Sequence, residues 1–479
     1  MTASTSVLLN DLLTAPRQII GEDRRMGGGP TRGIENPRTC ETIATISDAN
    51  AVDVTDAVAA AETALSDWSR TEVGTRVRLL SALAAQLSAV APDLATLIEL
   101  EQGSPPPLAR RLHVDLAIEV VSSIAELLPS TEFERVIANS RVVREPVGVV
   151  AAITPWNLPL YQVAVKLAPL LAAGCTVVLK PSELTPLSAL AFAHAARNAG
   201  FPPGVINVVT GAKDVAVALA SEKSISMISF TGSTEVGRQI AGRAAATVKR
   251  CTLELGGKSP SIILPNCDDT LLETAVKLTV GNCFLNGGQT CTALSRLLVP
   301  RKHAEAVAEM AAEFARKYVP GDRLGPLISA PHRDRVLDYI RLGSDQGARL
   351  LIGGTENPQD LPDLDHYVWP TVFAGVDPTT RIAQEEIFGP VLSIITYDEV
   401  DEAIRFANGT IYGLTSAIWG TDPDQAKLVA QHIRAGQVDI NAAAFNTRAP
   451  FGGYGQSGLG RELGVEGILD CTEIKSIQQ

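Results

Sequence analysis

The middle of the chain alternates short β-branched runs with stretches whose apolar residues recur at helical spacing. The runs predict strands at 142–154, 176–180, 205–211 and 225–233, and the stretches between them predict helices at 161–173, 185–198 and 234–246. A second series predicts strands at 261–265, 296–300 and 391–396, with helices at 270–283 and 302–318. Strands that alternate with helices form parallel sheets covered on both faces, so the predicted fold class is α/β.

The N-terminal part of the chain is predicted to be mainly helical. Residues up to about Arg25 show little pattern and are expected to form a loose arm. Helices are predicted at 53–68, 75–100 and 110–128, and Pro92 interrupts the second of them. The tail, 438–477, holds a glycine-rich loop and a final apolar segment.

Polar and glycine residues gather at the predicted carboxyl ends of the first strand series. Asn157, Lys180, Gly211 and Gly232 lie at or just beyond these ends. Parallel α/β sheets bind their ligands outside the carboxyl ends of the strands. We therefore expect a ligand site at this edge.

Composition narrows the class of partner. With 479 residues, 46% of them hydrophobic and 20% charged, the chain is expected to be a globular protein of two or three domains. Its net charge of -12 disfavours nucleic acid or an anionic membrane as the main partner. The sequence opens without a basic leader and apolar core, and prolines interrupt the longest nearly uncharged run, 147–179. A soluble, cytoplasmic protein is expected.

Seven cysteines are spread along the chain without a CxxC pair. Their odd number and wide spacing predict neither a disulfide framework nor a metal site, and they fit a reducing compartment. Cys291 stands out because it follows a Gly-Gly-Gln turn. Such a turn leaves a mobile, uncluttered backbone whose N–H groups can face a substrate oxygen. The alternative is a small buried hydrophobe, as most free cysteines are.

A nucleophilic thiol needs a base or a depressed pKa. None of the six histidines lies in a glycine-rich turn, which disfavours a Cys/His hydrolase. Glu254 ends an apolar strand before two glycines and is a candidate general base for water, or else a structural partner of Lys258. Asn157 is a candidate amide donor to an oxyanion, or else an Asx-turn residue that initiates a helix.

Three features point to a dinucleotide. The segment 232–237 (GSTEVG) follows a strand and opens a helix, a context in which helix N-termini bind phosphate. It is not a GxGxxG sequence, and alone such glycines more often mark only a turn. Lys180 can reach a ribose or phosphate oxygen, and Glu183 can accept from the adenosine ribose hydroxyls. Because a carboxylate there would repel a 2′-phosphate, NAD is favoured over NADP.

Seven short segments carry motif-like sequences. In chain order they are PWN (155–157), KPSE (180–183), FTGSTEVG (230–237), LELGGKSP (253–260), GQTC (288–291), EEIFGP (385–390) and PFGGY (450–454). Together they resemble the aldehyde dehydrogenase superfamily, in its hydrolytic, NAD(P)-dependent branch. The resemblance covers roughly residues 30 to 477, and seven segments in the family's order are very specific.

The resemblance implies NAD-dependent oxidation of an aldehyde to the carboxylic acid. Cys291 would be the nucleophile, which forms a thiohemiacetal and then a thioester, and Glu254 would be the base for hydrolysis. Asn157 and the Cys291 N–H would form the oxyanion hole. Glu386 would hold the nicotinamide ribose, with Phe388 near the nicotinamide. The rest of the NAD site is implied to be Thr154, Trp156, Lys180, Glu183, Gly211, Phe230, Gly232, Ser233, Val236 and Leu255.

The resemblance also implies the domain organisation. A Rossmann-like parallel-sheet NAD domain would comprise 1–119 and 146–253, and a second α/β catalytic domain would comprise 254–436. A small β oligomerisation arm with the C-terminal tail would comprise 120–145 and 437–479 and would build a homodimer or homotetramer.

The implied substrate tunnel is mainly apolar. Its residues would be Tyr161, Gln162, Val165, Leu285, Ala443, Phe445 and Phe451. Val165 stands where many members carry a large aromatic residue, so a medium or bulky apolar aldehyde is expected. Arg448 would argue otherwise if it pointed inward.

Two positions depart from the family pattern, and two other activities remain open. His332 stands where many members carry a glutamine that touches the cofactor, and Gly455 where lysine is common. A CoA-acylating dehydrogenase is one alternative, although the presence of Glu254 speaks against it. The other is a non-catalytic, crystallin-like protein on the same scaffold.

Overall fold

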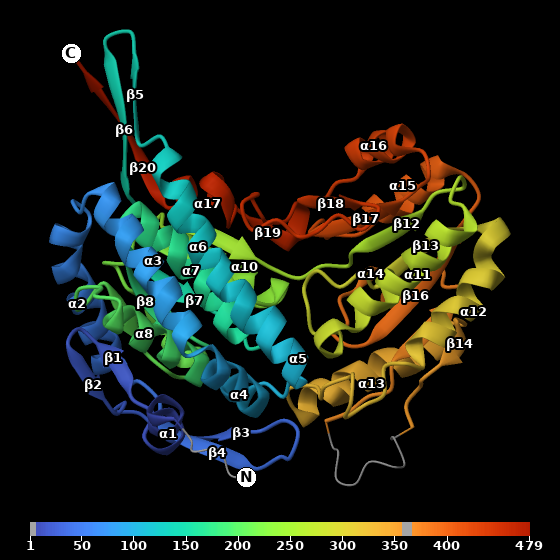
Figure 1. Ribbon diagram of the computed structural model, residues 1–479, viewed down its shortest axis with the longest axis horizontal. Coiled ribbons are helices and arrows are strands. Elements are labelled where there is room, and N and C mark those ends of the chain that lie inside the picture. Colours follow the sequence, from blue (N-terminus) through green and yellow to red (C-terminus); the bar gives the residue numbers. More distant parts are fainter. Residues whose placement is uncertain (1–5, 357–365) are drawn as a thin grey trace.

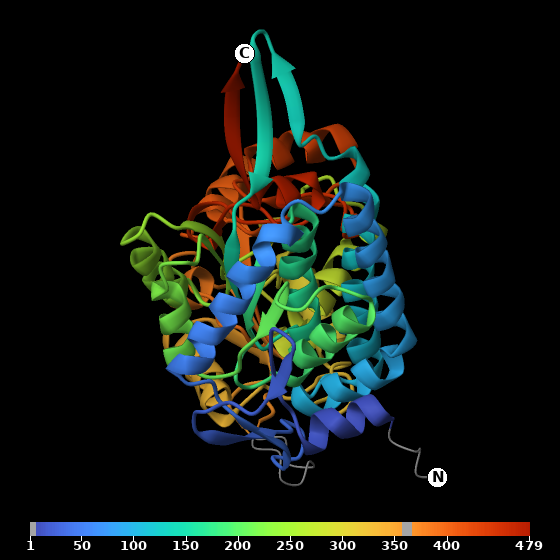
Figure 2. The same cartoon turned by 90° about the vertical axis from the view of Figure 1, so that its left-hand side faces the viewer.

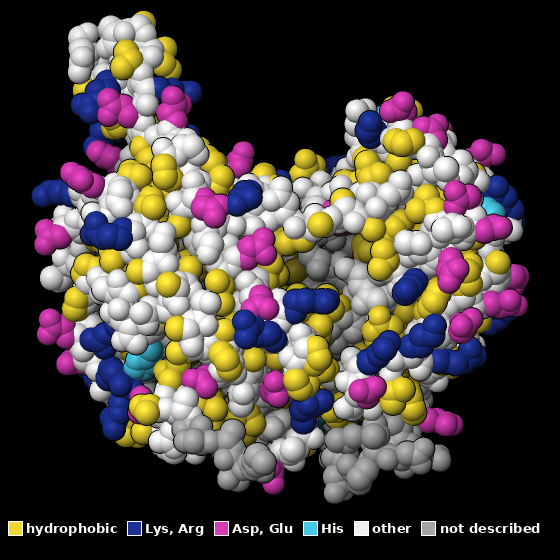
Figure 3. Space-filling model, in the orientation of Figure 1, with side chains coloured by type: hydrophobic (Ala, Val, Ile, Leu, Met, Phe, Trp, Pro, Cys, Tyr) yellow, Lys and Arg dark blue, Asp and Glu magenta, His cyan; other side chains and the backbone are white. Residues whose placement is uncertain are grey.

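The computed structural model describes residues 6–356 and 366–479. They form two α/β bodies side by side, and a β-arm projects from the first of them (Figure 1). Figure 2 shows that this arm stands clear of the rest of the molecule. A hollow separates the two bodies on the face shown in Figure 3.

The first body is built on an eight-stranded sheet. In spatial order its strands are β19 (Gly458–Leu459), β11 (Arg250–Glu254), β10 (Met227–Thr231), β7 (Val149–Ile153), β8 (Thr176–Lys180), β9 (Ile206–Val208), β1 (Gln18–Ile20) and β2 (Asp23–Arg25). The strands from β11 to β9 are parallel, whereas β19, β1 and β2 run antiparallel to their neighbours. Strands β7, β8 and β10 are buried at every position, as expected for a parallel sheet between two layers of helices.

Helices cover both faces of this sheet. On one face lie α3 (Val73–Ala89), α4 (Ala91–Glu101), α5 (Pro106–Leu108), α6 (Leu116–Leu127), α7 (Pro159–Ala173), α8 (Leu187–Asn198) and α17 (Gly464–Asp470), and on the other lie α2 (Ala51–Trp68), α9 (Lys213–Ser221) and α10 (Thr234–Ala245). A short hairpin, β3 (Thr31–Glu35) and β4 (Thr42–Ser47), packs with α1 (Val7–Thr14) at the edge of the body. Among the described residues no single helix is long and apolar enough to cross a membrane, although α3 and α4, which meet at a 69° bend, pass that test jointly.

The second body is built on a seven-stranded sheet. In spatial order its strands are β14 (Arg349–Ile352), β15 (Thr371–Ala374), β16 (Val391–Tyr397), β13 (Arg296–Pro300), β12 (Pro260–Ile263), β17 (Thr415–Trp419) and β18 (Gln437–Ile440). Its helices are α11 (Asp269–Phe284), α12 (Ala304–Ala315), α13 (Ala330–Asp345), α14 (Arg381–Gln384), α15 (Val400–Asn408) and α16 (Pro423–His432). The prediction of two α/β bodies with parallel sheets is confirmed.

The arm is a three-stranded antiparallel sheet. Its strands are β5 (Glu134–Ile137), β6 (Ser140–Pro146) and β20 (Thr472–Gln478), with β6 in the centre. The last strand of the chain therefore pairs with a hairpin more than three hundred residues earlier, from Thr472 opposite Pro146 to Gln478 opposite Ser140. Strand β18, which begins where the arm and tail were expected to begin, belongs to the seven-stranded sheet.

Three local predictions were wrong. The N-terminal segment is not a loose arm, because α1 buries Leu9 and Leu12 and strand β1 joins the sheet beside β9. The predicted strand 142–154 is divided between β6 and β7 by Gly148, which has a φ of +125°. Residues 109–115 form a π-helix before α6, so the predicted helix 110–128 is only partly α-helical.

Candidate active site

The carboxyl ends of the first strand series meet as predicted. Strand β7 lies between β10 and β8, so Ile153 pairs with both Phe230 and Lys180. Thr154, which follows β7, is also bonded to this strand end, since its backbone N–H donates to the Lys180 carbonyl at 3.1 Å. The segments that begin beyond these strands therefore share one edge of the sheet.

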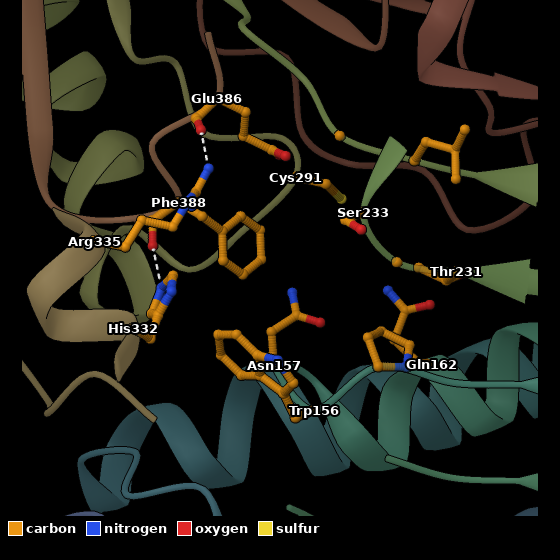
Figure 4. A pocket seen from close by; sticks show the side chains of 14 residues that line it. Trp156, Asn157, Gln162, Thr231, Ser233, Cys291, His332, Arg335, Glu386 and Phe388 are labelled. Atoms are coloured by element: carbon orange, nitrogen blue, oxygen red, sulfur yellow. Dashed lines mark hydrogen bonds between the residues drawn. The ribbon is translucent and has the colours of Figure 1, made fainter. Parts of the chain in front are cut away.

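A cavity of about 340 Å³ opens at this edge, between the two bodies. Its lining combines the turn after β7, the start of α7, the end of β10 with the turn that leads into α10, the segment after β11, Cys291, the start of α13 and the loop before β16 (Figure 4). The lining residues are Pro155, Trp156, Asn157, Gln162, Thr231, Gly232, Ser233, Leu255, Gly256, Cys291, His332, Arg335, Glu386 and Phe388.

The turn that carries Cys291 is braced and not mobile. Its Asn286 has a φ of +54°, and Gly287 and Gly288 are also left-handed. The Gln289 side chain, which is fully buried, donates to the carbonyls of Asn286 (2.9 Å) and Pro326 (3.1 Å), and it accepts from the Ile328 N–H (2.9 Å). The glutamine of the predicted turn therefore ties the turn before Cys291 to the segment before α13.

A close contact also joins this turn to the loop before β16. A Cβ on Gly288 would lie 2.2 Å from the carbonyl carbon of Gly389, which is shorter than any real contact. Gly288 is therefore required for two reasons, its φ of +73° and this approach.

The Cys291 thiol faces the cavity in an environment that opposes ionisation. Burial first, and then the carboxyl groups of Glu386 and Glu254, together raise its pKa to about 12. Only its own backbone N–H, which lies beside the sulfur, lowers the pKa. The same N–H therefore lies close enough to the sulfur to donate a hydrogen bond to the oxygen of a substrate carbon that bonds to this sulfur.

Asn157 reaches the same cavity from the turn after β7 (Figure 4). Its side-chain amide donates to the Gln289 carbonyl at 2.9 Å, and its own carbonyl accepts from the Asn286 side chain at 2.9 Å. These two bonds fix Asn157 against the turn before Cys291. Because an amide group has two N–H donors, one remains for a ligand in the cavity.

Glu254 lies behind the cavity and not on its lining. Its carboxyl group is 3% exposed and neither oxygen has a hydrogen-bond partner among the described residues. One oxygen lies against Gly452, where a Cβ would be only 2.7 Å away. Burial, and then the neighbouring Glu462, hold its pKa well above the ordinary value, while Lys166 opposes that shift. The alternative pairing of Glu254 with Lys258 is absent from the described contacts, and the Lys258 amine is also without a partner there.

The predicted cofactor residues fall into two groups. Six line the cavity, namely Trp156, Gly232, Ser233, Leu255, Glu386 and Phe388. The others extend along the strand ends beyond it, namely Thr154, Lys180, Glu183, Gly211, Phe230 and Val236. Lys180 forms an ion pair with Glu183 at 3.3 Å, and burial lowers the pKa of this lysine.

The predicted tunnel residues are more dispersed. Gln162 shares the cavity with Cys291, whereas Tyr161 and Val165 are buried on α7. Leu285 lines a second cavity of about 290 Å³ with Leu108, Arg111, Leu112, Asp115, Leu116 and Glu119. Phe445 is 40% exposed, and its ring meets that of Phe451 edge-on at 6.2 Å, while Ala443 is exposed.

A known protein family matches nearly the whole chain. The model of the aldehyde dehydrogenase family matches residues 27–477. The chain belongs to the aldehyde dehydrogenase family. One aldehyde dehydrogenase relative, 3-succinoylsemialdehyde-pyridine dehydrogenase from a Pseudomonas species, is 42% identical over 467 residues, which are 96% of this chain and 97% of the relative.

Solved aldehyde dehydrogenases share the fold over nearly the whole chain. A mutant of aldehyde dehydrogenase C from Pseudomonas syringae, complexed with NAD+ and octanal, has a TM-score of 0.94 at 43% identity, with coverage of 97% of this chain and 96% of that one. A Mycobacterium tuberculosis aldehyde dehydrogenase complexed with NAD+ also has a TM-score of 0.94, at 38% identity and 97% and 98% coverage. The predicted family and fold are thus confirmed.

Sequence reasoning missed part of the aldehyde dehydrogenase cavity, namely Pro155, Thr231, Gly256 and Arg335. It left His332 open, and the structure shows its Nε2–H donating to the Phe388 carbonyl at 2.8 Å. Burial lowers the pKa of His332 to about 4, so the ring is neutral at physiological pH. Arg335 donates to the carbonyls of Ile387 (2.7 Å) and Glu386 (2.8 Å). These partners lie far away in sequence, and spacing on α13 alone would have placed His332 and Arg335 on one helix face.

Proposed function

We propose that this aldehyde dehydrogenase oxidises an aldehyde to the carboxylic acid with NAD+, with Cys291 as its nucleophile. The observation that carries the proposal is a shared cavity. The Cys291 thiol and the Asn157 amide both line it, together with Ser233, Glu386 and Phe388 (Figure 4). A reacting carbon and a dinucleotide can therefore meet in one place.

The described residues fit NAD. Ser233 caps α10 by accepting from the Val236 N–H, so the helix begins at the cavity with a partial positive charge. The Thr231 hydroxyl, which lines the cavity, has no protein partner among the described residues. A Cβ on Gly256 would lie 2.1 Å from a Glu386 oxygen, so this glycine leaves the carboxyl group in place beside the cavity. When bound there, NAD+ would supply the acceptor for the hydride.

Charge pairing at the far end of the site supports NAD over NADP. The two cations near Glu183 are both already paired, Lys180 with Glu183 itself at 3.3 Å and Arg32 with Asp48 at 2.8 Å. A 2′-phosphate would have to displace one of these carboxylates. The ribose hydroxyls of NAD would instead donate to Glu183.

In the proposed mechanism the Cys291 thiolate attacks the aldehyde carbonyl carbon. The oxyanion that forms would accept from the free Asn157 N–H and from the Cys291 backbone N–H. Loss of hydride from this carbon leaves a thioester on the sulfur. The cavity wall of Trp156, His332 and Phe388, whose rings meet at 5.3 to 6.0 Å, would hold water away from the reacting atoms.

Glu254 is proposed as the base for hydrolysis of the thioester. Its raised pKa makes the Glu254 carboxylate a stronger base than an ordinary glutamate. Because its carboxyl group lies behind the cavity, it would reach the thioester by turning towards Cys291 or through one water. Its effect on the Cys291 pKa supports proximity between the two groups.

The substrate is proposed to be a medium or bulky apolar aldehyde. Four of the residues that line the second cavity are leucines, Leu108, Leu112, Leu116 and Leu285, and the charged Arg111, Asp115 and Glu119 line the rest of it. Arg448 is exposed and paired with Glu126 instead of pointing at Cys291. A similar solved structure contains octanal. We also propose the domain division given above, except that β18 belongs to the catalytic domain and that α6 and β19 belong to the NAD domain. A cytoplasmic location and assembly through the arm into a homodimer or homotetramer complete the proposal.

Burst kinetics with octanal and NAD+ test the mechanism. Cys291→Ala should abolish NADH formation. Glu254→Gln should keep a first turnover of NADH but lower the steady-state rate by about a hundredfold or more, since only hydrolysis loses its base. An undiminished steady-state rate in Glu254→Gln would remove Glu254 from this role, and NADH formation by Cys291→Ala would end the proposal.

Two further measurements separate the alternatives. A CoA-acylating enzyme would yield acyl-CoA when CoA is added, whereas the proposed enzyme yields only the acid. A crystallin-like protein would give no NADH with any aldehyde.

A further inference from the structure

Three side chains with metal-binding atoms converge on the side of the molecule opposite the arm. Glu35 ends β3 and Cys40 lies in the turn before β4, while His366 comes from the second body, 326 residues after Cys40. The Cys40 sulfur lies 3.9 Å from the His366 Nε2, and a Glu35 carboxyl oxygen lies 3.7 Å from the same nitrogen. All three atoms are within 4.8 Å of one another.

The imidazole is oriented for ligation. His366 Nδ1 lies 3.1 Å from the Pro37 carbonyl, which can only accept, so Nδ1 carries the proton. Nε2, which faces Cys40 and Glu35, is then left with its lone pair. Metal-binding histidines are commonly fixed in this way by a carbonyl on the other ring nitrogen. The histidine is buried, at 5% exposure, and its carbonyl accepts from the Leu327 N–H at 2.8 Å, so its position is well defined.

The turn that carries Cys40 is also well defined. Asn36 accepts through its side chain from the Arg38 N–H (2.9 Å) and through its carbonyl from the Cys40 N–H (2.8 Å). Its N–H donates to the Glu41 carbonyl at 2.8 Å, which closes the turn. Figure 1 shows this hairpin reaching beneath α4 and α5 towards the second body.

The spacing fits a tetrahedral ion. Bond lengths of about 2.3 Å to sulfur and about 2.0 Å to nitrogen and oxygen place neighbouring ligand atoms roughly 3.3 to 3.6 Å apart. The two separations from Nε2 exceed this range by a few tenths of an ångström, and the Cys40 sulfur and the Glu35 oxygen lie within 4.8 Å of each other. Rotation of the two exposed side chains, Glu35 and Cys40, would bring the three atoms to bonding distance of one ion. Thiolate, imidazole and carboxylate together are the donor set of zinc and similar divalent ions.

We propose that Glu35, Cys40 and His366 form a zinc site that joins the two bodies. Glu35 and Cys40 are exposed, so the fourth ligand position would open to water. The cysteine spacing predicted no metal site, because His366 lies far from Glu35 and Cys40 in the chain and no CxxC pair marks the site. The site would stabilise the contact between the bodies, since Leu327 binds His366 and the adjoining Ile328 binds Gln289 of the turn before Cys291.

Metal binding is best measured in a Cys291→Ala background, which removes the cavity thiol as a competing ligand. Equilibrium dialysis with Zn2+ should show one bound ion per chain. Cys40→Ser and His366→Asn should each weaken binding at least tenfold, and Glu35→Gln should weaken it less. Co2+ in place of Zn2+ should give a thiolate-to-metal absorption band that Cys40→Ser abolishes.

Matched controls are available on the same chain. Cys251→Ser, His432→Asn and Glu309→Gln change the same residue types on β11, α16 and α12, away from the three ligand atoms, and should leave Zn2+ binding intact. Zn2+ should raise the Tm of the parent and of these controls, but not that of Cys40→Ser, because only a metal bound to the folded state stabilises it. Comparable Tm values without metal would show that the variants fold.

Two results would overturn the proposal. One is a parent protein that takes up no Zn2+. The other is Zn2+ binding that survives both Cys40→Ser and His366→Asn, which would place the ion elsewhere.

Discussion

The Cys291 side chain is held in its protonated form by its surroundings. Burial and the nearby carboxyl groups of Glu386 and Glu254 all favour the neutral thiol, and its own backbone N–H opposes them only in part. With a pKa raised to about 12, the thiolate is a small fraction at neutral pH and grows as pH rises. In the proposed mechanism, a bound ligand must therefore lower the pKa of Cys291 before the thiolate can attack the aldehyde.

Alkylation of Cys291 should therefore depend steeply on pH. In the protein without ligands, its labelling rate by iodoacetamide should rise about tenfold per pH unit from pH 7 to 10 without a plateau, because thiolate is the reacting form. Peptide mapping by mass spectrometry would separate Cys291 from Cys40, which is exposed. A plateau with a midpoint at or below the ordinary value of about 8.5 would contradict the raised pKa.

A second feature at the residue scale is a buried ion pair. Lys166 lies 2.7 Å from Glu462, and both side chains are almost fully buried. Lys166→Met would leave the Glu462 carboxylate without its cation and should lower the free energy of unfolding by about 3–5 kcal/mol. Chemical denaturation measures this loss.

The double variant Lys166→Met/Glu462→Gln serves as the control. It removes the orphaned charge and should recover much of the stability. If the double variant were as unstable as the single one, packing and not charge would explain the loss.

Among the elements, the turn before Cys291 depends on a neighbouring helix end. The Asn286 side chain accepts from Gln102 (3.1 Å) and Ser104 (3.0 Å), which follow α4, and donates to the Asn157 carbonyl. Asn286→Ala should lower the free energy of unfolding by about 2–3 kcal/mol, since buried donors lose their acceptor. It should also lower kcat, because Asn157 loses a support.

Asn286→Gly separates backbone from side chain. It loses the same hydrogen bonds but adopts the φ of +54° without strain, so it should be about 1 kcal/mol more stable than Asn286→Ala. Thermal unfolding and steady-state kinetics on both variants check the two effects. Equal stability of both with the parent protein would contradict this role for the side chain.

Element prediction succeeded where the apolar period was long and regular. Helices such as α2, α7 and α11 were confirmed to within two residues of their ends. It failed for β1 and β2, which have three residues each and so carry almost no periodicity. The π-helix at 109–115 was also missed, because its apolar residues recur at nearly the same spacing as in an α-helix.

Across the whole molecule, the arm exposes apolar residues that a monomer would leave in water. On β5 Val136 is 71% exposed, and on β20 Ile474 is 61% exposed. Both outer strands of the three-stranded sheet also have open edges among the described residues. Exposed edges and apolar side chains of this kind favour association between chains.

Replacing both residues should weaken that association. Val136→Asp/Ile474→Asp adds charge to the arm without removing a strand, so each chain should still fold and bind NAD+. Light scattering after size exclusion should show a smaller particle than the parent protein. An unchanged mass would exclude this part of the arm as the assembly surface.

From the sequence, only those residues of the candidate site that lie within recognisable motifs could be predicted. The order of segments brought Cys291 and Asn157 to one cavity, as expected. The position of Glu254 behind that cavity could not be predicted, since it depends on Gly452 and on the Lys166–Glu462 pair, which other segments supply. Arg335 was missed for a similar reason, because its partners are main-chain carbonyls.

The contact between Gly288 and Gly389 holds the turn before Cys291 close to the loop that carries Phe388. With no side chain between them, the peptide planes of the two loops rest directly on each other. Cys291 follows one loop by three residues, and Phe388 immediately precedes the glycine of the other. This backbone contact, which does not depend on any side chain of the cavity, therefore helps to set how far Cys291 lies from the Phe388 ring.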